Sequence, residues 1–305
     1  MGVMQLFHPY SYVAVCAGFL VGIGITAVCV GLTSAVCIAV CAWIGMIRIK
    51  PLLELCKRVI YCLFYDTITR LEDNIRESFT VAFKDKDCLR QRMIYMWHPH
   101  GVFAVSQTLH LASSLTDWPC NSEQVIKPTA LSYLQWLPFG SELFEEFGAI
   151  PSDYHTMKKT LEGGASVSLL PGGMREMYTG THLLKRRRGI FKMAIETGTP
   201  LVPVISVGED KLYDCVGVPG WIQDYLAPYD ICLAIPTLSS VAKWIGLLQH
   251  PLKDTIHSIV GKPIPVEKKD VATEADIAAL RSLYIDTLVK MYKEETDQEE
   301  DIIVE

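Results

Sequence analysis

Residues 93–101, MIYMWHPHG, join a short apolar run to two histidines, a proline and a glycine. The apolar part, residues 93–97, is typical of a strand that is buried on both faces of a sheet. The proline and the glycine then predict a rigid, exposed turn, which holds His98 and His100 at the end of that strand. Because histidine has an ordinary pKa of about 6.5, this turn is the first candidate for acid–base chemistry.

The rest of the chain after residue 93 alternates predicted strands with predicted helices. We expect further strands at residues 129–133, 166–170, 200–208 and 257–261, and helices at residues 102–115, 141–147, 154–161, 189–198 and 273–293. Such alternation predicts an α/β fold with a mainly parallel sheet flanked by helices, in which the chemistry takes place at the carboxyl ends of strands. In the last helix, Thr273 is the expected cap with Asp276 at the third position. One face of that helix is apolar: Ile277, Leu280, Tyr284, Leu288 and Met291.

The first 47 residues contain no Lys, Arg, Asp or Glu. One bilayer-spanning helix needs about 20 residues, so the apolar run at residues 12–47 predicts a hairpin of two short membrane helices within residues 1–50. The first bases, Arg48 and Lys50, place the following segment on the cytosolic side. One tilted span stays open as an alternative to the hairpin. A buried globular helix is a further alternative, although core helices seldom lack charge over such a length. Residues 51–92 predict an amphipathic helical connector on or near the membrane surface.

The net charge of −6 arises at one end of the chain. Residues 294–305, EETDQEEDIIVE, hold seven carboxylates and no base, and they predict a disordered acidic tail. The remaining chain has 28 basic and 27 acidic side chains, without a broad basic face or a motif for nucleic acid. Six of the ten cysteines fall within the first 62 residues, and no CxxC pair occurs, which is typical of a reduced, cytosol-facing protein.

Four sequence blocks occur in a characteristic order: HPHG at residues 98–101, LLPGGMRE at 169–176, RRGIFKMAIETGTPLVPVISVGEDKLY at 187–213 and VGKPIPV at 260–266. In this order they resemble the type-2 diacylglycerol acyltransferase family. That family includes monoacylglycerol and wax-alcohol acyltransferases, and it is distantly similar to the glycerol-phosphate acyltransferases.

The resemblance covers about residues 93–290 and implies a glycerolipid-acyltransferase-like domain at residues 93–293. It implies transfer of a fatty acyl group to a lipid alcohol from acyl-CoA, which is a co-substrate, with no cofactor. Diacylglycerol is the acceptor that we expect first, with triacylglycerol as the product, and monoacylglycerol and long-chain alcohols stay open. The family also implies a place in the endoplasmic reticulum membrane or on lipid droplets, with membrane lipid as a partner, and a homo-oligomer stays open.

The resemblance implies that His98 is the general base, because it stands where the wider superfamily has the histidine of a His-x4-Asp motif. His100 is the second candidate for this role. The aspartate of that motif is absent, since Phe103 lies five residues past His98. Glu176, in the segment GGMRE, is therefore the candidate for the acid that orients the base or positions the substrate.

The other predicted site residues are backbone and cationic groups that would bind substrates: Pro99, Gly101, Gly172, Gly173, Arg186, Arg187 and Arg188. Backbone amides at the glycines would hold the developing oxyanion. The arginines suit the phosphates of coenzyme A, with lipid headgroups or water as the alternative. The family's late His-x-x-Tyr is altered, because Arg281 stands in place of the histidine before Tyr284, and we expect no role for this pair.

Acyl transfer has several alternatives. A hydrolase lacks support, because the chain has no GxSxG motif. Two histidines in a turn would also serve as a strand cap or as metal ligands, but no Cys or His cluster has the spacing of a zinc site, so no metal is expected. An inactive lipid-droplet or membrane protein of the same fold is the non-enzyme alternative, although such a protein has no reason to keep both His98 and Glu176.

Two apolar segments would rest either on a bilayer or in the core: WIQDYL at residues 221–226 and WIGLLQ at residues 244–249. We expect the first of them in the core.

Overall fold

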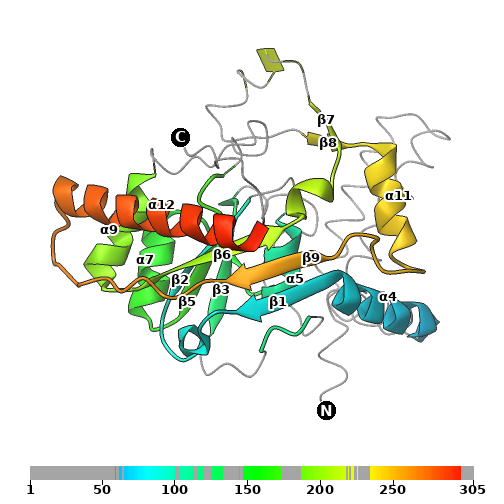
Figure 1. Ribbon diagram of the computed structural model, residues 1–305, viewed down its shortest axis with the longest axis horizontal. Coiled ribbons are helices and arrows are strands. Elements are labelled where there is room, and N and C mark those ends of the chain that lie inside the picture. The colour runs from blue at the N-terminus through cyan, green and yellow to red at the C-terminus, as the bar shows by residue number, and fades with distance from the viewer. Residues whose placement is uncertain are drawn as a thin grey trace.

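Figure 1 shows the computed structural model of the chain. The structure describes residues 59, 62–63, 65–99, 104–112, 116–119, 125–132, 144, 147–173, 187–217, 219, 221–222, 225 and 234–296. The predicted membrane hairpin at residues 1–50 and most of the predicted helix at residues 141–147 lie outside these residues. Among the helices that are described, none is both long enough and apolar enough to cross a membrane.

A seven-stranded sheet forms the centre of the described chain, in the order β1-β9-β6-β2-β5-β3-β4. Its strands are β1 (Phe79–Phe83), β2 (Ile94–His98), β3 (Ile126–Ala130), β4 (Ile150–Pro151), β5 (Ser166–Leu169), β6 (Leu201–Val207) and β9 (Ile256–Val260). Neighbouring strands are parallel except β6 and β9, so β1 and β9 run opposite to the other five. The predicted α/β fold with a mainly parallel sheet is therefore confirmed. A separate antiparallel pair is formed by β7 (Cys215–Gly217) and β8 (Ala234–Pro236).

Helices flank the sheet and connect its strands. They are α4 (Tyr65–Ser78), α5 (Val105–Ala112), α7 (Tyr154–Glu162), α9 (Arg188–Thr197), α11 (Leu238–Gly246) and α12 (Glu274–Thr296), with short 3-10 turns η1 (Lys86–Leu89) and η3 (Glu209–Lys211). Helices α7, α9 and α12 pack together and onto the sheet, whereas α4 and α11 lie at the opposite end of the molecule (Figure 1).

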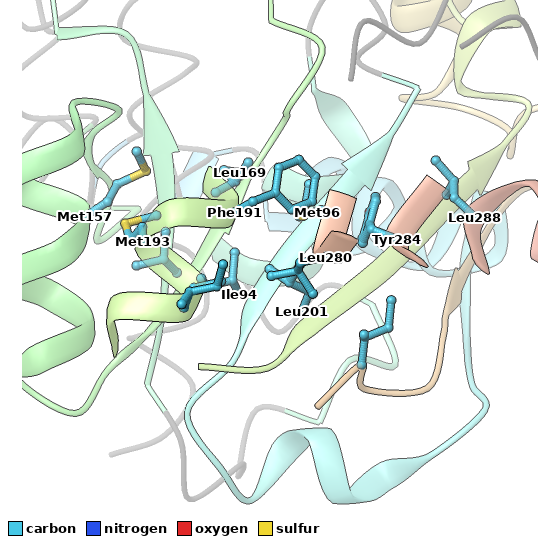
Figure 2. Close-up of a cluster of buried hydrophobic side chains, with 14 of the residues drawn as sticks. Ile94, Met96, Met157, Leu169, Phe191, Met193, Leu201, Leu280, Tyr284 and Leu288 are labelled. Atoms are coloured by element: carbon cyan, nitrogen blue, oxygen red, sulfur yellow. The ribbon is translucent and has the colours of Figure 1, made fainter. Parts of the chain in front are cut away.

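Strand β2 is buried on both faces, as its continuous apolar sequence predicts. Ile94 and Met96 face the core formed with α7, α9 and α12, which Figure 2 shows in close-up. Tyr95 and Trp97 face a second core on the other side, where Trp97 lies 5.9 Å from Trp118 between ring centroids. The strand that ends at the histidine turn therefore lies in the most restrained part of the fold.

The ends of the helices follow the local sequence. The side chain of Thr273 accepts a hydrogen bond from the amide of Asp276 at 3.2 Å, and Asp276 accepts one from the amide of Thr273 at 3.1 Å, so the predicted cap of α12 is confirmed. Helix α9 ends at Gly198, whose φ of 63° is a left-handed conformation that glycine adopts without strain. Both helices therefore begin or end where the capping residues of the sequence place that end.

Four predictions about elements need correction. The connector at residues 51–92 contains β1, which belongs to the sheet because it pairs with β9. The third strand lies at Ile126–Ala130, a few residues before the predicted range. Helix α12 continues to Thr296, so the first three residues assigned to the acidic tail are helical. Trp221 and Tyr225, expected in the core, are 73% and 70% exposed.

Candidate functional site

The carboxyl ends of the parallel strands β2, β5 and β6 lie at one edge of the sheet. Strand β2 ends at His98, which pairs with Ile205 of β6. Strands β2 and β5 pair in parallel up to Met96 and Leu169. His98 at the end of β2 and the Pro-Gly-Gly turn at residues 171–173 after β5 therefore lie at the same edge, as expected for a site in a parallel sheet.

His98 is completely buried, which corrects the expectation of an exposed turn. It is the last residue of β2, and strand alternation places its side chain on the same face as Ile94 and Met96, toward α12. Its Nε2 atom lies 2.9 Å from the hydroxyl oxygen of Tyr284, and the two groups share a hydrogen bond. The imidazole is thus held at a fixed angle inside the protein.

Tyr284 is a site residue for which the sequence predicted no role. It lies 186 residues from His98 along the chain, and α12 carries it to the end of β2. The ring of Phe191, from α9, contacts it edge-on at 5.9 Å between centroids. Figure 2 shows the two rings close together above Met96 and Leu280. The predicted apolar face of α12 was a signal for a buried tyrosine, but only the tertiary structure brings it to His98.

Gly172 and Gly173 form the turn after β5, and Arg187 binds this turn. The Nη2 atom of Arg187 donates a hydrogen bond to the carbonyl oxygen of Gly172 at 2.9 Å. Gly173 has a φ of +61°, and a Cβ atom there would lie 2.6 Å from the same nitrogen, so glycine leaves room for the guanidinium. The amide of Gly173 donates to the carbonyl of Leu170 at 3.2 Å, which engages it within the turn.

Arg188 points to a different partner. It is the first residue of α9 and forms an ion pair with Glu274 at the start of α12. Its side chain remains 59% exposed. The positive charge of Arg188 is therefore partly neutralised, whereas Arg187 is held against the Gly172 turn.

Glu209 is a second residue that the sequence did not single out. It follows β6 and Gly208, is 2% exposed, and accepts hydrogen bonds from the amides of Val105 at 2.8 Å and Ser106 at 3.2 Å. The hydroxyl of Ser106 also donates to it. Because α5 begins at Val105, the carboxylate holds the end of the segment that starts at His98. The signal in the sequence that could have found Glu209 is an acidic residue directly after a predicted buried strand.

Burial raises the pKa of Glu209 to about 7, and the hydrogen bonds from Ser106 and Val105 offset this only in part. The unfolded chain releases this proton near pH 4.5, whereas the folded chain keeps it up to about pH 7. The contribution of Glu209 to the free energy of unfolding is therefore greatest below about pH 4.5. It falls by roughly 3 kcal/mol as pH rises to about 7.

We expect the variant Glu209→Gln to remove this slope, because glutamine has no proton to release in this range. The measurement is the free energy of unfolding of the full chain in detergent at a series of pH values between 4 and 8. The difference between wild type and variant should change by roughly 3 kcal/mol across this window. Two parallel curves would show that Glu209 does not titrate as described.

Four predicted site residues, His100, Gly101, Glu176 and Arg186, lie outside the described residues, so their roles stay predictions. Pro99 is half-buried, and the peptide bond between His98 and Pro99 is cis. Of the predicted set, the structure places His98 at the end of β2 and Gly172 and Gly173 after β5, and it joins Arg187 to Gly172. Tyr284 is joined to His98, and Glu209 follows β6 at the same edge of the sheet. Within the described part of the chain, no three His, Cys, Asp or Glu side chains gather as metal ligands.

The fold and this edge define an α/β protein with a histidine-centred polar site at the carboxyl ends of parallel strands. A family model described as diacylglycerol acyltransferase matches residues 56–302. The chain belongs to this family.

Relatives with known names cover most of the same region. The 2-acylglycerol O-acyltransferase 1 of Mus musculus is 31% identical over 228 residues, which cover 66% of this chain and 64% of that protein. The acyl-CoA wax alcohol acyltransferase 2 of Homo sapiens is 28% identical, with 67% and 66% covered. The diacylglycerol O-acyltransferase 1 of Saccharomyces cerevisiae is 26% identical, with 75% and 58% covered. The chain thus spans slightly less than two thirds of the length of the first of these relatives.

A solved structure is also among the matches. The 1-acyl-sn-glycerophosphate acyltransferase of Thermotoga maritima matches with a TM-score of 0.45 and 13% sequence identity, covering 79% of this chain and 93% of that chain.

Proposed function

We propose that the protein transfers a fatty acyl group from acyl-CoA to the hydroxyl group of a lipid alcohol, with His98 as the general base. The observation that carries this proposal is the hydrogen bond between His98 and Tyr284 at the carboxyl edge of the sheet, in a chain of the diacylglycerol acyltransferase family. If the Tyr284 oxygen accepts the proton of Nε2, the lone pair of the imidazole is on Nδ1. Tyr284 then selects the tautomer in which Nδ1 acts as the base.

The reaction proceeds by addition and elimination at the thioester. His98 takes the proton of the acceptor hydroxyl, whose oxygen attacks the thioester carbonyl carbon and forms a tetrahedral oxyanion. The carbon–sulfur bond then breaks, the ester is released, and the thiolate of coenzyme A takes the proton from His98. We assign stabilisation of the oxyanion to the Gly172 amide and the predicted Gly101 amide. Glu176 keeps its predicted role in orienting the base or positioning the substrate, and His100 stays the second candidate for the base.

A buried base suits transfer to a lipid alcohol. Hydrolysis of acyl-CoA competes with transfer wherever water reaches the base, and the complete burial of His98 limits that access. Diacylglycerol is the acceptor that we propose first, with triacylglycerol as product. The names of the mouse and human relatives point to monoacylglycerol and to long-chain alcohols as the alternatives. The experiment that tests acyl transfer and identifies the acceptor is an assay of the purified protein in detergent, with labelled acyl-CoA and these three acceptors in parallel. If no ester formed with any of the three acceptors, the proposal would be refuted.

The membrane hairpin at residues 1–50, the cytosol-facing orientation and the location in the endoplasmic reticulum or on lipid droplets stay predictions from the sequence. Protease protection of tags at the two termini in sealed microsomes is their test. A protected tag at one end beside an accessible tag at the other would refute the hairpin.

Tyr284→Phe tests the orienting hydrogen bond, because it removes the hydroxyl and keeps the ring in its buried position. One hydrogen bond of about 1 kcal/mol corresponds to a fall in kcat of roughly five- to tenfold. Since Tyr284 acts through His98 and not on the substrates, the KM values should stay nearly unchanged. The pH at which kcat is half-maximal should also shift, because the imidazolium loses a partner. An unchanged kcat and pH profile would show that this contact plays no part in turnover.

Arg187→Gln tests the binding of the donor. The phosphates of coenzyme A do not react, so a lost contact to them weakens binding in the ground state and the transition state alike. We expect the KM for acyl-CoA to rise by roughly five- to twentyfold, while the KM for the acceptor stays constant. Arg188→Gln should raise it less, because Glu274 already pairs with that charge. Lys290→Gln, at a side chain that is 79% exposed on α12, is the control for loss of one charge. A donor KM in neutral detergent that Arg187→Gln leaves unchanged would remove this role.

A further inference from the structure

Helix α11 exposes apolar side chains on one face and turns a partly polar face inward. Leu238 is 90% exposed, Val241 45% and Ile245 61%, and Leu248, just after the helix, is 39% exposed. Positions three, four and seven residues apart lie on one face of a helix, so these residues form a continuous strip. We call Leu238, Val241, Ile245 and Leu248 the α11 strip. The inner side of the helix meets the core through Trp244 and Leu247, so the α11 strip is a second apolar face, which points outward.

The inner face of α11 is fixed to the protein body. The hydroxyl of Ser240, which is completely buried, donates to the carbonyl of Asp214 at 3.0 Å and accepts from the amide of Asp214 at 2.8 Å. The rings of Trp244 and Tyr213 are stacked with 5.8 Å between their centroids. Because these contacts set the rotation of the helix, the α11 strip cannot turn toward the core without breaking them. It is presented outward by the fold itself.

Helix α11 is also joined to the helix that leads back to the N-terminal apolar segment. The side-chain amide of Asn74, in α4, donates to the carbonyl of Leu247 at 2.8 Å. The hydroxyl of Ser78, at the end of α4, accepts from the amide of Leu252 at 2.8 Å. Just before α4, Leu63 is 71% exposed. Both helices lie at one end of the molecule (Figure 1), and the chain upstream of α4 includes the 47 residues without a charged side chain.

We propose that the α11 strip inserts into the interfacial region of a lipid bilayer. The α11 strip is aliphatic and lies beside a polar face that includes Lys243, which is the pattern of a helix at a lipid surface. Helix α11 is also bonded to α4, which comes after the charge-free apolar segment in the sequence. A second copy of the chain would be the other occupant of such a face, but the charge-free sequence upstream of α4 favours lipid. The helix then lies in the plane of the membrane and orients the α/β domain on it. This inference deepens the proposed function, since it gives a lipid acceptor a short path from the bilayer to the domain.

The test is photo-cross-linking of the full chain, which does not depend on catalysis. Benzoylphenylalanine replaces Ile245 in one variant and Leu283, 51% exposed on α12, in the control. Both are reconstituted into phosphatidylcholine vesicles that contain a trace of radiolabelled phosphatidylcholine and are then illuminated. We expect labelled protein predominantly from the variant at position 245, and thermal unfolding like that of the wild type in both.

Two outcomes would overturn the inference: lipid adducts at position 245 no more frequent than at position 283, or cross-links from position 245 mainly to a second copy of the chain. Failure of the acyl-transfer assay would leave this result readable, because the adduct forms without turnover. Conversely, an absent adduct beside normal ester formation would reject the membrane face and leave the proposed function intact.

Discussion

Replacing His98 by glutamine is expected to lower the turnover number by a factor of about a hundred or more, because general-base catalysis contributes about 10²- to 10⁴-fold. Glutamine retains a hydrogen-bonding group for Tyr284 but cannot take up a proton at neutral pH. It is preferred to alanine because His98 is completely buried and alanine would leave a cavity. The measurement is kcat with labelled acyl-CoA and the best acceptor, at matched protein concentration.

Two comparisons make this result specific. His155→Gln, at an exposed position on α7, should leave kcat unchanged and serves as the matched control. His100→Gln tests the other histidine of the turn and should be less harmful than His98→Gln. Thermal unfolding of each variant shows whether the fold is kept. Near-normal activity of a folded His98→Gln variant, with a large loss in His100→Gln, would move the base to His100.

The second large effect concerns stability. Phe191 is completely buried in the core between α9, α12 and the sheet (Figure 2), and its ring contacts Tyr284. Removing it as Phe191→Ala should lower the free energy of unfolding by about 3–5 kcal/mol, since both the transfer free energy and a cavity are involved. The measurement is denaturant unfolding of the full chain in detergent.

Leu283→Ala is the control for Phe191→Ala, because Leu283 lies next to Tyr284 in the sequence but is 51% exposed. Its cost should be within about 0.5 kcal/mol. If the two variants lost similar amounts of stability, the core between α9 and α12 would not be packed as described. If Phe191→Ala also lowered kcat while Leu283→Ala did not, the packing of Tyr284 would be linked to the orientation of His98.

Strand β2 and helix α12 could be predicted because their patterns are determined locally. Burial of both faces of β2 requires an unbroken apolar run, and residues 93–97 supply it. In α12, a buried residue recurs every three or four positions, from Ile277 to Met291. The Thr273 cap marks where that helix begins. In both elements, one short window of sequence contains all the information that is needed.

Strand β1 could not be predicted in this way. Its sequence, FTVAF, follows directly on the charged helix α4, and only Phe79 at its start is fully buried. The strand exists because it pairs with β9, beginning with Phe79 opposite Ile256. Such a long-range pairing leaves little trace in the local pattern, so the amphipathic helix pattern was extended through it.

The same difference between local and long-range signals explains why only part of the site could be predicted. The histidine turn and the Gly172–Gly173 turn are short motifs that carry their own signal. The contact between His98 and Tyr284 depends on how α12 crosses the sheet. Arg281, in place of the family's usual histidine, removes the motif that would have marked this helix as part of the site. The role of Glu209 depends on where α5 begins in space, which its neighbours in sequence do not reveal.

The measurement that tests the central claim most directly is the stoichiometry of acyl transfer by the purified full-length protein. Free thiol from acyl-CoA and labelled ester from the acceptor are quantified in the same reaction, with and without acceptor, for wild type and His98→Gln. The account predicts one ester formed per thiol released, little thiol released without acceptor, and loss of both products in His98→Gln. Thiol release without ester would indicate a hydrolase, and equal ester formation by wild type and His98→Gln would contradict the proposed role of His98.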